Sequence, residues 1–144
     1  PTPLLVTAIT VHNIPEGMAV GLAFALAAGG EGFAGALALA LGIGIQNFPE
    51  GAAVSLPLRQ LGMPPGRAFW IGVLSGAVEP LFGILVVLVA AGATPVMPWL
   101  LSFSAGAMLY VVMHELIPAA PGRPGIWGFF TGFILMMALD MALG

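Results

Sequence analysis

The sequence predicts an all-α fold, a polytopic bundle of helices that span a lipid bilayer. The first observation is composition: hydrophobic residues make up 60% of the 144 residues and charged residues only 6%, whereas a soluble domain has roughly a quarter of its residues charged. The mean hydropathy of +1.10 also indicates a chain that is surrounded largely by lipid. The second observation is that the chain divides into five apolar runs, each close to the about 20 residues with which a helix crosses a bilayer. We therefore expect a single transmembrane domain over residues 1–144.

Short segments rich in Gly, Pro or charge separate the five expected helices. The first helix ends at a Gly-Gly-Glu-Gly turn, and the second is followed by a loop that carries Pro64 and Pro65. Pro95 lies in the third turn, and residues 119–124 form the fourth. Because the chain begins within an apolar run at Pro1 rather than at Met, we expect it to be part of a longer protein. The expected helices cover residues 3–28, 33–58, 68–91, 98–118 and 125–143.

The three arginines set the expected orientation. Arg59 and Arg67 lie in the second loop and Arg123 in the fourth, and alternating spans place these two loops on the same side. The positive-inside rule makes that side cytoplasmic, so the C-terminus faces away from the cytoplasm. The expected location is the cell membrane, which is the inner membrane in a Gram-negative bacterium. The charges form no basic face, which excludes nucleic acid as a partner, and the absence of cysteine excludes disulfides and thiolate metal sites.

Two of the expected helices contain nearly the same hexapeptide. Residues 12–17 read HNIPEG, and residues 46–51, 34 positions later, read QNFPEG. Consecutive spans run antiparallel, so the motif occurs twice in opposite directions. This arrangement indicates a pseudo-two-fold axis in the membrane plane, a common design among transporters.

Each copy of the motif places ligand-type side chains on one helical face. His12 and Glu16 are four residues apart and Asn13 and Glu16 three, so their side chains share a face. Glu79, next to Pro80, adds a third carboxylate inside an apolar run, and no span contains a Lys or Arg to pair with it. Because a carboxylate at the bilayer centre costs about 2.5–3.5 kcal/mol, these groups must be protonated, hydrated or neutralised by cations. The candidate metal ligands are His12, Asn13, Glu16, Gln46, Asn47, Glu50 and Glu79.

The chemistry of these side chains indicates which cations they bind. Carboxylate oxygens together with an imidazole nitrogen suit zinc and the neighbouring first-row divalent ions. Three glutamates can bridge two such ions, with amide oxygens completing the coordination. A single intramembrane Glu also fits a helix-packing or proton-handling role. The two motif copies, His12 and the third glutamate together favour a metal site.

At these residues the sequence resembles the ZIP family of divalent-metal transporters. HNIPEG is similar to the signature of that family's fourth helix, and QNFPEG to that of the fifth helix in its prokaryotic members. Residues 75–80 (SGAVEP) resemble the sixth helix, and residues 106–118, ending in HELIP, resemble the seventh. The resemblance covers nearly the whole chain, as helices four to eight of an eight-helix inverted-repeat fold. It implies that the first three helices of the same protein are structural partners of this chain.

The resemblance implies a binuclear site and transport of divalent metal ions into the cytoplasm by alternating access. Zinc is the expected substrate, and iron, manganese and cadmium are further candidates. Glu16 and Glu50 would bridge the two ions. Several family members carry His or Asp at the positions of Gln46 and Asn47, and neutral amides ligate more weakly, which leaves the occupancy of the second metal position open. The family topology agrees with the orientation derived from the arginines; no enzymatic activity is implied, and a homodimer is a candidate assembly.

Two further sets of residues are candidates for the ends of a metal pathway. His114 and Glu115 lie near the cytoplasmic end of the fourth expected helix, where an exit site and an interfacial cap are equally consistent with the sequence. The zinc-protease motif HExxH is absent because Pro118 stands at its second histidine position. Asp140, near the outer end of the last helix, is a candidate for attracting cations at the entrance, with packing as the simpler alternative.

Two other classes of function could use the same glutamates. An intramembrane metal-dependent hydrolase needs an open metal position and a general base, and the sequence offers no second-histidine motif and no serine with a partnered base beside it in sequence. A proton-conducting or structural membrane subunit needs only the carboxylates, and metal bound between the first two helices would argue against it. The serines concerned are Ser55, Ser75, Ser102 and Ser104.

Overall fold

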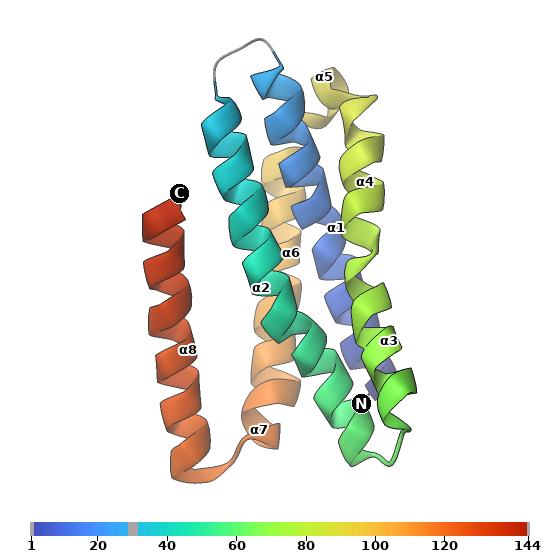
Figure 1. Ribbon diagram of the computed structural model, residues 1–144, viewed down its shortest axis with the longest axis vertical. Helices are drawn as coiled ribbons and strands as arrows, with labels where there is room; N and C mark the ends of the chain where they lie inside the picture. The colour runs from blue at the N-terminus through green and yellow to red at the C-terminus, as the bar shows by residue number, and fades with distance from the viewer. Residues whose placement is uncertain (1, 29–31, 144) are drawn as a thin grey trace.

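The expected all-α fold is confirmed in the computed structural model, which describes residues 2–28 and 32–143 (Figure 1). Within these two ranges the chain forms helices joined by short turns and no strand. Alanine and leucine, which are strong helix formers, are frequent in these segments. The α-helices are α1 (Thr2–Ala27), α2 (Phe33–Gln60), α3 (Pro65–Gly76), α4 (Val78–Val87), α5 (Ala90–Ala93), α6 (Met97–Val111), α7 (Ile117–Ala119) and α8 (Gly122–Leu143), and the π-helix η1 (Val112–Leu116) lies between α6 and α7.

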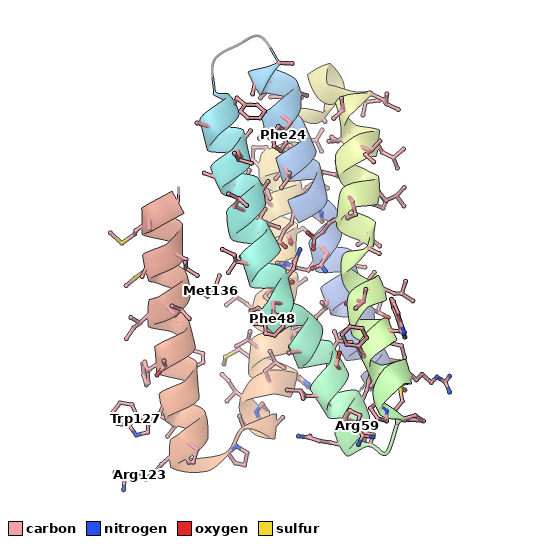
Figure 2. The ribbon with its side chains drawn as sticks, in the orientation of Figure 1. Phe24, Phe48, Arg59, Arg123, Trp127 and Met136 are labelled. Carbon is pink, nitrogen blue, oxygen red and sulfur yellow. The ribbon has the colours of Figure 1, made fainter. Side chains whose placement is uncertain are left out.

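Helix α1 lies at the centre of the bundle, where it packs against α2, α3, α4 and α6. Figure 1 shows α1 and α2 as antiparallel neighbours and α8 on the outer side of α2. Arg59 and Arg123 lie at the same end of the bundle (Figure 2), as the alternation of spans predicts. Which membrane face this end meets stays a prediction.

Three helical stretches in the described part of the chain are long and apolar enough to cross a membrane. They are Pro3–Ala27, Pro65–Val87 and Met97–Ala119, and they coincide with three of the five expected spans. For α2 and α8, crossing of the bilayer stays a prediction. Helix α2 has sufficient length, at 28 residues, but the polar side chains of its motif lower its hydropathy.

The third expected span, residues 68–91, corresponds to the helical stretch Pro65–Val87, which is interrupted at one residue. The interruption falls at Ala77, between α3 and α4, where the backbone keeps right-handed helical angles of φ −65° and ψ −15°. Pro80 explains the break, because it has no N–H to pair with the carbonyl of Gly76 four residues earlier. The Ala77 N–H bonds to a carbonyl three residues earlier, at 3.2 Å, which is a tighter step. Glu79 consequently lies in the first turn of α4, where the helix dipole favours a carboxylate.

The fourth expected helix, residues 98–118, contains a π-helical turn. The Ile117 N–H donates to the carbonyl of Val112, five residues earlier. Pro118 has no N–H for the carbonyl of His114, and a single π turn is a common way for a helix to absorb a local irregularity. His114 therefore stands on a wider turn than an α-helix would give it.

Two apolar clusters fill the two ends of the bundle. Their buried members are Leu5, Ile9, Val54, Leu58, Ala68 and Val111 in the first, and Leu22, Val86, Ala93 and Met97 in the second. The first cluster joins the start of α1 to the end of α2, and the second joins the end of α1 to the end of α4. The HNIPEG motif of α1 falls between them. The polar residues of the motif therefore lie midway along the bundle, with close apolar packing on either side.

Glycines bring the backbones of α1 and α4 into direct contact beside the motif. A Cβ added at Gly17 would lie 2.5 Å from the Cα of Glu79 and 2.7 Å from its carbonyl carbon, distances that real Cβ atoms do not reach. A Cβ at Gly83 would lie 3.0 Å from the carbonyl oxygen of Gly17. Small residues permit this close approach of helices in membranes. The contact fixes the position of Glu79 along the axis of α1.

Candidate metal centre

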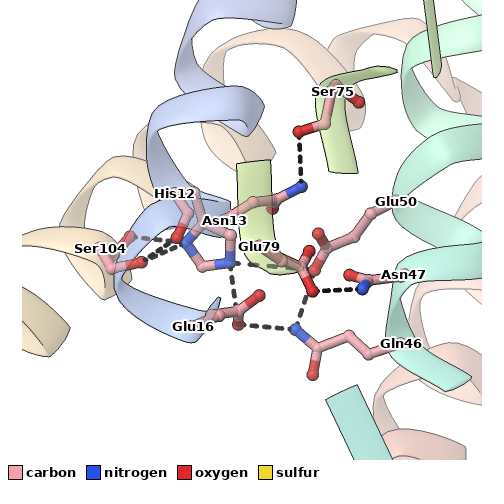
Figure 3. A network of polar contacts seen from close by, with 9 residues as sticks. All are labelled: His12, Asn13, Glu16, Gln46, Asn47, Glu50, Ser75, Glu79 and Ser104. Atoms are coloured by element: carbon pink, nitrogen blue, oxygen red, sulfur yellow. Dashed lines mark hydrogen bonds and ion pairs between the residues drawn. The ribbon is translucent and has the colours of Figure 1, made fainter. Parts of the chain in front are cut away.

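Four helices direct polar side chains to one region between the apolar clusters (Figure 3). Because α1 and α2 are antiparallel neighbours, the two motif copies face each other. The break before α4 adds Glu79, and α6 adds a serine that lies outside both motifs. The residues are His12, Asn13 and Glu16 from α1, Gln46, Asn47 and Glu50 from α2, Glu79 from α4 and Ser104 from α6.

The centre of the region is formed by one imidazole and two carboxylates. His12, Glu16 and Glu50 each offer an atom within 4.8 Å of the other two. The His12 Nε2 lies 3.2 Å from Glu16 Oε1 and 3.8 Å from Glu50 Oε1. His12 is buried and the two glutamates are half-buried. One imidazole nitrogen and two carboxylate oxygens at this spacing are a donor set that zinc accepts.

The Gln46 amide group lies between the two central carboxylates. Its Nε2 donates to Glu16 Oε1 at 3.0 Å and to Glu50 Oε1 at 2.8 Å. The two carboxylate oxygens thus share a hydrogen-bond donor of partial positive charge, and no Lys or Arg ion pair is present among the described residues of the region. For Gln46 to act as a metal ligand, as the resemblance implies, the amide plane must turn so that its oxygen replaces its nitrogen.

The two asparagines also donate through their amide nitrogens, and their amide oxygens make no hydrogen bond. Asn13 Nδ2 donates to the carbonyl of Ser75 at 3.1 Å. Because a carbonyl oxygen only accepts hydrogen bonds, this contact fixes which amide atom faces Ser75. Asn47 Nδ2 donates to Glu79 Oε2. In both residues the amide oxygen remains available for another partner.

Six buried side-chain atoms of the region make no hydrogen bond within the described structure. Leaving a buried polar atom without a hydrogen bond costs about 1–3 kcal/mol. The set includes His12 Nε2, whose 3.2 Å contact with Glu16 Oε1 is an ion-pair contact. All six are nitrogen or oxygen atoms of the kind that coordinates divalent ions, so the residues present fit a cation. The atoms are His12 Nε2, Asn13 Oδ1, Glu16 Oε2, Asn47 Oδ1, Glu50 Oε2 and Glu79 Oε1.

The other ring nitrogen of His12 faces Ser104 on α6. His12 Nδ1 lies 2.6 Å from the Ser104 hydroxyl and 3.1 Å from the Ser104 carbonyl oxygen. Ser104 therefore has an imidazole neighbour in the fold that does not stand near it in the sequence. The 92 positions between the two residues explain why no motif revealed the pair. The Ser104 hydroxyl donates its hydrogen to the His12 carbonyl at 3.0 Å, so the geometry is not that of a nucleophile activated by a base.

His114, one of the two candidate exit residues, does not join this centre. The His114 ring is exposed and stacks on Tyr110, with ring centroids 5.1 Å apart and an angle of 16° between the planes. The side chains of Glu115 and Asp140 lie outside the described residues. Both roles therefore stay predictions.

Comparison with known proteins assigns the family. Residues 2–140 match the family described as ZIP Zinc transporter. The chain belongs to the ZIP family. Relatives of this ZIP chain include the proteins named zinc transporter ZIP11 of Bos taurus and Homo sapiens, 52% and 51% identical over 98% of the chain and 43% of their own length. Zinc transporter GufA of Myxococcus xanthus is 44% identical over 98% of the chain and 56% of its own length.

The ZIP chain spans about half the length of the curated relatives it matches. The family resemblance inferred from the HNIPEG and QNFPEG motifs is thereby confirmed, and ZIP proteins are membrane proteins. What the motif residues do in the whole protein is taken up below as a proposal.

The position of Gln46 predicts how this ZIP chain responds to one added charge. Gln46→Glu replaces the shared amide donor by a third carboxylate beside Glu16 and Glu50. The metal-free state then loses two hydrogen bonds and gains repulsion, and a divalent ion relieves both. We expect the affinity for Zn²⁺ to rise by about tenfold or more, equivalent to about 1.4 kcal/mol, in titrations of the full-length protein against a chelating dye.

The matched control is Gln60→Glu, the same substitution at the exposed end of the same helix. It should leave the affinity for Zn²⁺ unchanged. An unchanged or weaker affinity in Gln46→Glu would show that Gln46 does not share the position of the cation.

Proposed function

We propose that the full-length protein carries divalent metal ions across the cell membrane into the cytoplasm, with zinc as the principal substrate. The observation that carries the proposal is the group formed by His12, Glu16 and Glu50, whose ligand atoms lie within 4.8 Å of one another midway between two apolar clusters. The relatives named zinc transporters support the choice of ion. Cadmium, iron and manganese are further candidate ions.

The donor atoms divide naturally between two ion positions. The first ion binds His12, Glu16 and Glu50. The second binds the amide oxygens of Asn13 and Asn47 together with Glu79, and shares Glu16 and Glu50 with the first ion. Support comes from the unpartnered atoms, since each of these residues keeps one buried nitrogen or oxygen without a hydrogen bond. Gln46 joins the first position after its amide turns.

The zinc ion enters from the side opposite the arginine-bearing loops, with Asp140 at the entrance. A groove of about 420 Å³, lined mainly by apolar groups, extends from Asn47 and Glu79 along α1, α2 and α4 to Phe24 and Val87, and it supports entry from that end. The ion exchanges its water shell for the glutamates and His12. It leaves past His114 and Glu115, and protons that compete for the same ligands assist its release.

Alternating access requires helices that move together. The backbone contact between Gly17 on α1 and Glu79 on α4 couples two of the ligand-bearing helices, so they would carry the site as one unit. The remaining helices of the full-length protein, and a second copy of it, are the expected partners, with the lipid bilayer around them.

The two rival functions have less support. A hydrolase would need Ser104 or another hydroxyl to lose its proton to a base, but the Ser104 hydroxyl hydrogen is directed to the carbonyl of His12. A proton channel would use the glutamates alone, and it gives no role to the imidazole nitrogen of His12 or to the two asparagine oxygens that remain unpartnered.

The test is uptake of zinc by proteoliposomes that contain the full-length protein. Wild type should accumulate ⁶⁵Zn above protein-free liposomes, and Glu16→Ala and Glu50→Ala should reduce uptake to that background. Ser102→Ala, a change at an exposed position of α6, is the control and should transport as wild type. The proposal fails if both glutamate variants take up and bind zinc normally. Cleavage of peptide or lipid by the purified protein would favour the hydrolase.

A further inference from the structure

We propose that Ser104 is a positioning residue for the metal site: its two oxygens keep the proton of the neutral His12 imidazole on Nδ1 and so leave the Nε2 lone pair for a divalent ion. The inference deepens the proposed function and rests on it. Ser104 belongs to α6, a helix that supplies none of the proposed ligands. Its influence on the ion would pass entirely through the ring of His12 (Figure 3).

The contacts on one edge of the imidazole require a hydrogen on Nδ1. The Ser104 carbonyl oxygen lies 3.1 Å from Nδ1, and a carbonyl can only accept. The Ser104 hydroxyl lies 2.6 Å from Nδ1 and donates its own hydrogen to the His12 carbonyl at 3.0 Å. The hydroxyl therefore also presents a lone pair to the ring. Two acceptors face Nδ1 from the same residue.

The opposite edge of the ring competes weakly for the proton. Glu16 Oε1 and Glu50 Oε1 lie 3.2 and 3.8 Å from Nε2, but Nε2 makes no hydrogen bond. The same two oxygens already accept from the Gln46 amide, at 3.0 and 2.8 Å. The shorter and better directed contacts are those of Ser104. The neutral ring consequently carries its hydrogen on Nδ1.

This assignment matters because a neutral imidazole has one free lone pair. A histidine binds a metal through the nitrogen without hydrogen, and a partner on the other nitrogen fixes both the tautomer and the ring orientation. Ser104 is 2% exposed, so bulk water is not available to replace its hydroxyl. Loss of that hydroxyl would leave one longer contact, to the carbonyl, and would let the hydrogen move to the nitrogen that faces the ion.

The experiment measures the tautomer and the affinity separately in the full-length protein. Nitrogen-15 NMR of the metal-free protein, with histidine labelled and His12 assigned by comparison with His12→Gln, should show a single Nδ1–H tautomer in wild type. Ser104→Ala should show both tautomers and bind Zn²⁺ about tenfold more weakly, at the lower end of the effect of losing such a partner. Ser104→Thr, which keeps the hydroxyl, should restore the single tautomer and the affinity.

Ser102→Ala is the matched control, because Ser102 lies on the same helix with an exposed side chain. It should change neither measurement. The role of Ser104 is refuted if Ser104→Ala retains one tautomer and full affinity, or if wild type carries its hydrogen on Nε2; zinc binding and uptake by wild type would still stand. Absence of zinc binding by wild type would instead overturn the proposed function itself.

Discussion

Replacing Glu50 by Gln is expected to weaken binding at both metal positions, by at least about 100-fold at the first. The isosteric change removes one negative charge from the group that includes His12 and Glu16, and it removes an acceptor oxygen that has no partner. Losing even an outer partner of a ligand typically costs about 10–100-fold in metal affinity, so loss of a shared ligand costs more. Isothermal titration of the full-length protein with Zn²⁺ gives both the affinity and the number of ions.

Glu79→Gln is the comparison that separates shared from unshared ligands. Glu79 lies outside the group of three and is proposed to serve the second ion only, so this variant should still bind one ion with wild-type affinity.

Glu50→Gln should also raise the unfolding temperature of the metal-free protein, because it removes a charge that is costly at membrane depth. Retention of two ions at wild-type affinity in Glu50→Gln would contradict the shared role.

Replacing Gly17 by Ala is expected to disrupt the bundle beside the metal centre. The added Cβ would meet the backbone of Glu79, at 2.5 Å from its Cα and 2.7 Å from its carbonyl carbon. A backbone cannot rotate aside as a side chain can, so α1 and α4 must separate. Overpacking of this kind costs about 1–3 kcal/mol or more, and Glu79 moves away from the other ligands. Thermal unfolding in detergent and Zn²⁺ titration should both show the loss.

Gly51 provides a matched control, since it occupies the same place in the second copy of the motif. A Cβ at Gly51 would have its nearest neighbour, the Gly72 carbonyl oxygen, at 3.7 Å, which is ordinary contact. Gly51→Ala should therefore be tolerated, with a gain of up to about 1 kcal/mol from helix propensity. Equal destabilisation by the two substitutions would show that the α1–α4 contact is not the cause.

The sequence was sufficient to predict the helices and the meeting of the two motifs, because both depend on local rules. Hydropathy and Gly or Pro turns locate the helices, and spacings of three and four place His12 and Glu16 on one face. An antiparallel pair then brings Glu50 to them. Pro80 was visible in the sequence, but whether a proline kinks or divides a helix depends on its neighbours: Pro15 lies within a continuous α1, whereas α3 and α4 separate before Pro80.

Contacts between residues that are far apart in the chain could not be predicted from the sequence. Ser104 is one of several serines in apolar surroundings, and only the packing of α6 on α1 selects it as the partner of His12. The orientation of the Gln46 amide could not be predicted either, because an amide can direct either its oxygen or its nitrogen toward the centre of the site. That choice depends on the acceptors around it, here Glu16 and Glu50.

The π turn between α6 and α7 changes the direction in which the side chains that follow it point. A π turn is equivalent to one residue inserted into an α-helix, and each residue of an α-helix advances the direction of the side chain by about 100°. A helical wheel drawn through residues 97–119 as a uniform α-helix therefore misdirects the side chains that follow Val112. Deleting one residue within 112–116 would remove the extra residue and turn the segment leading into α8 by the same angle.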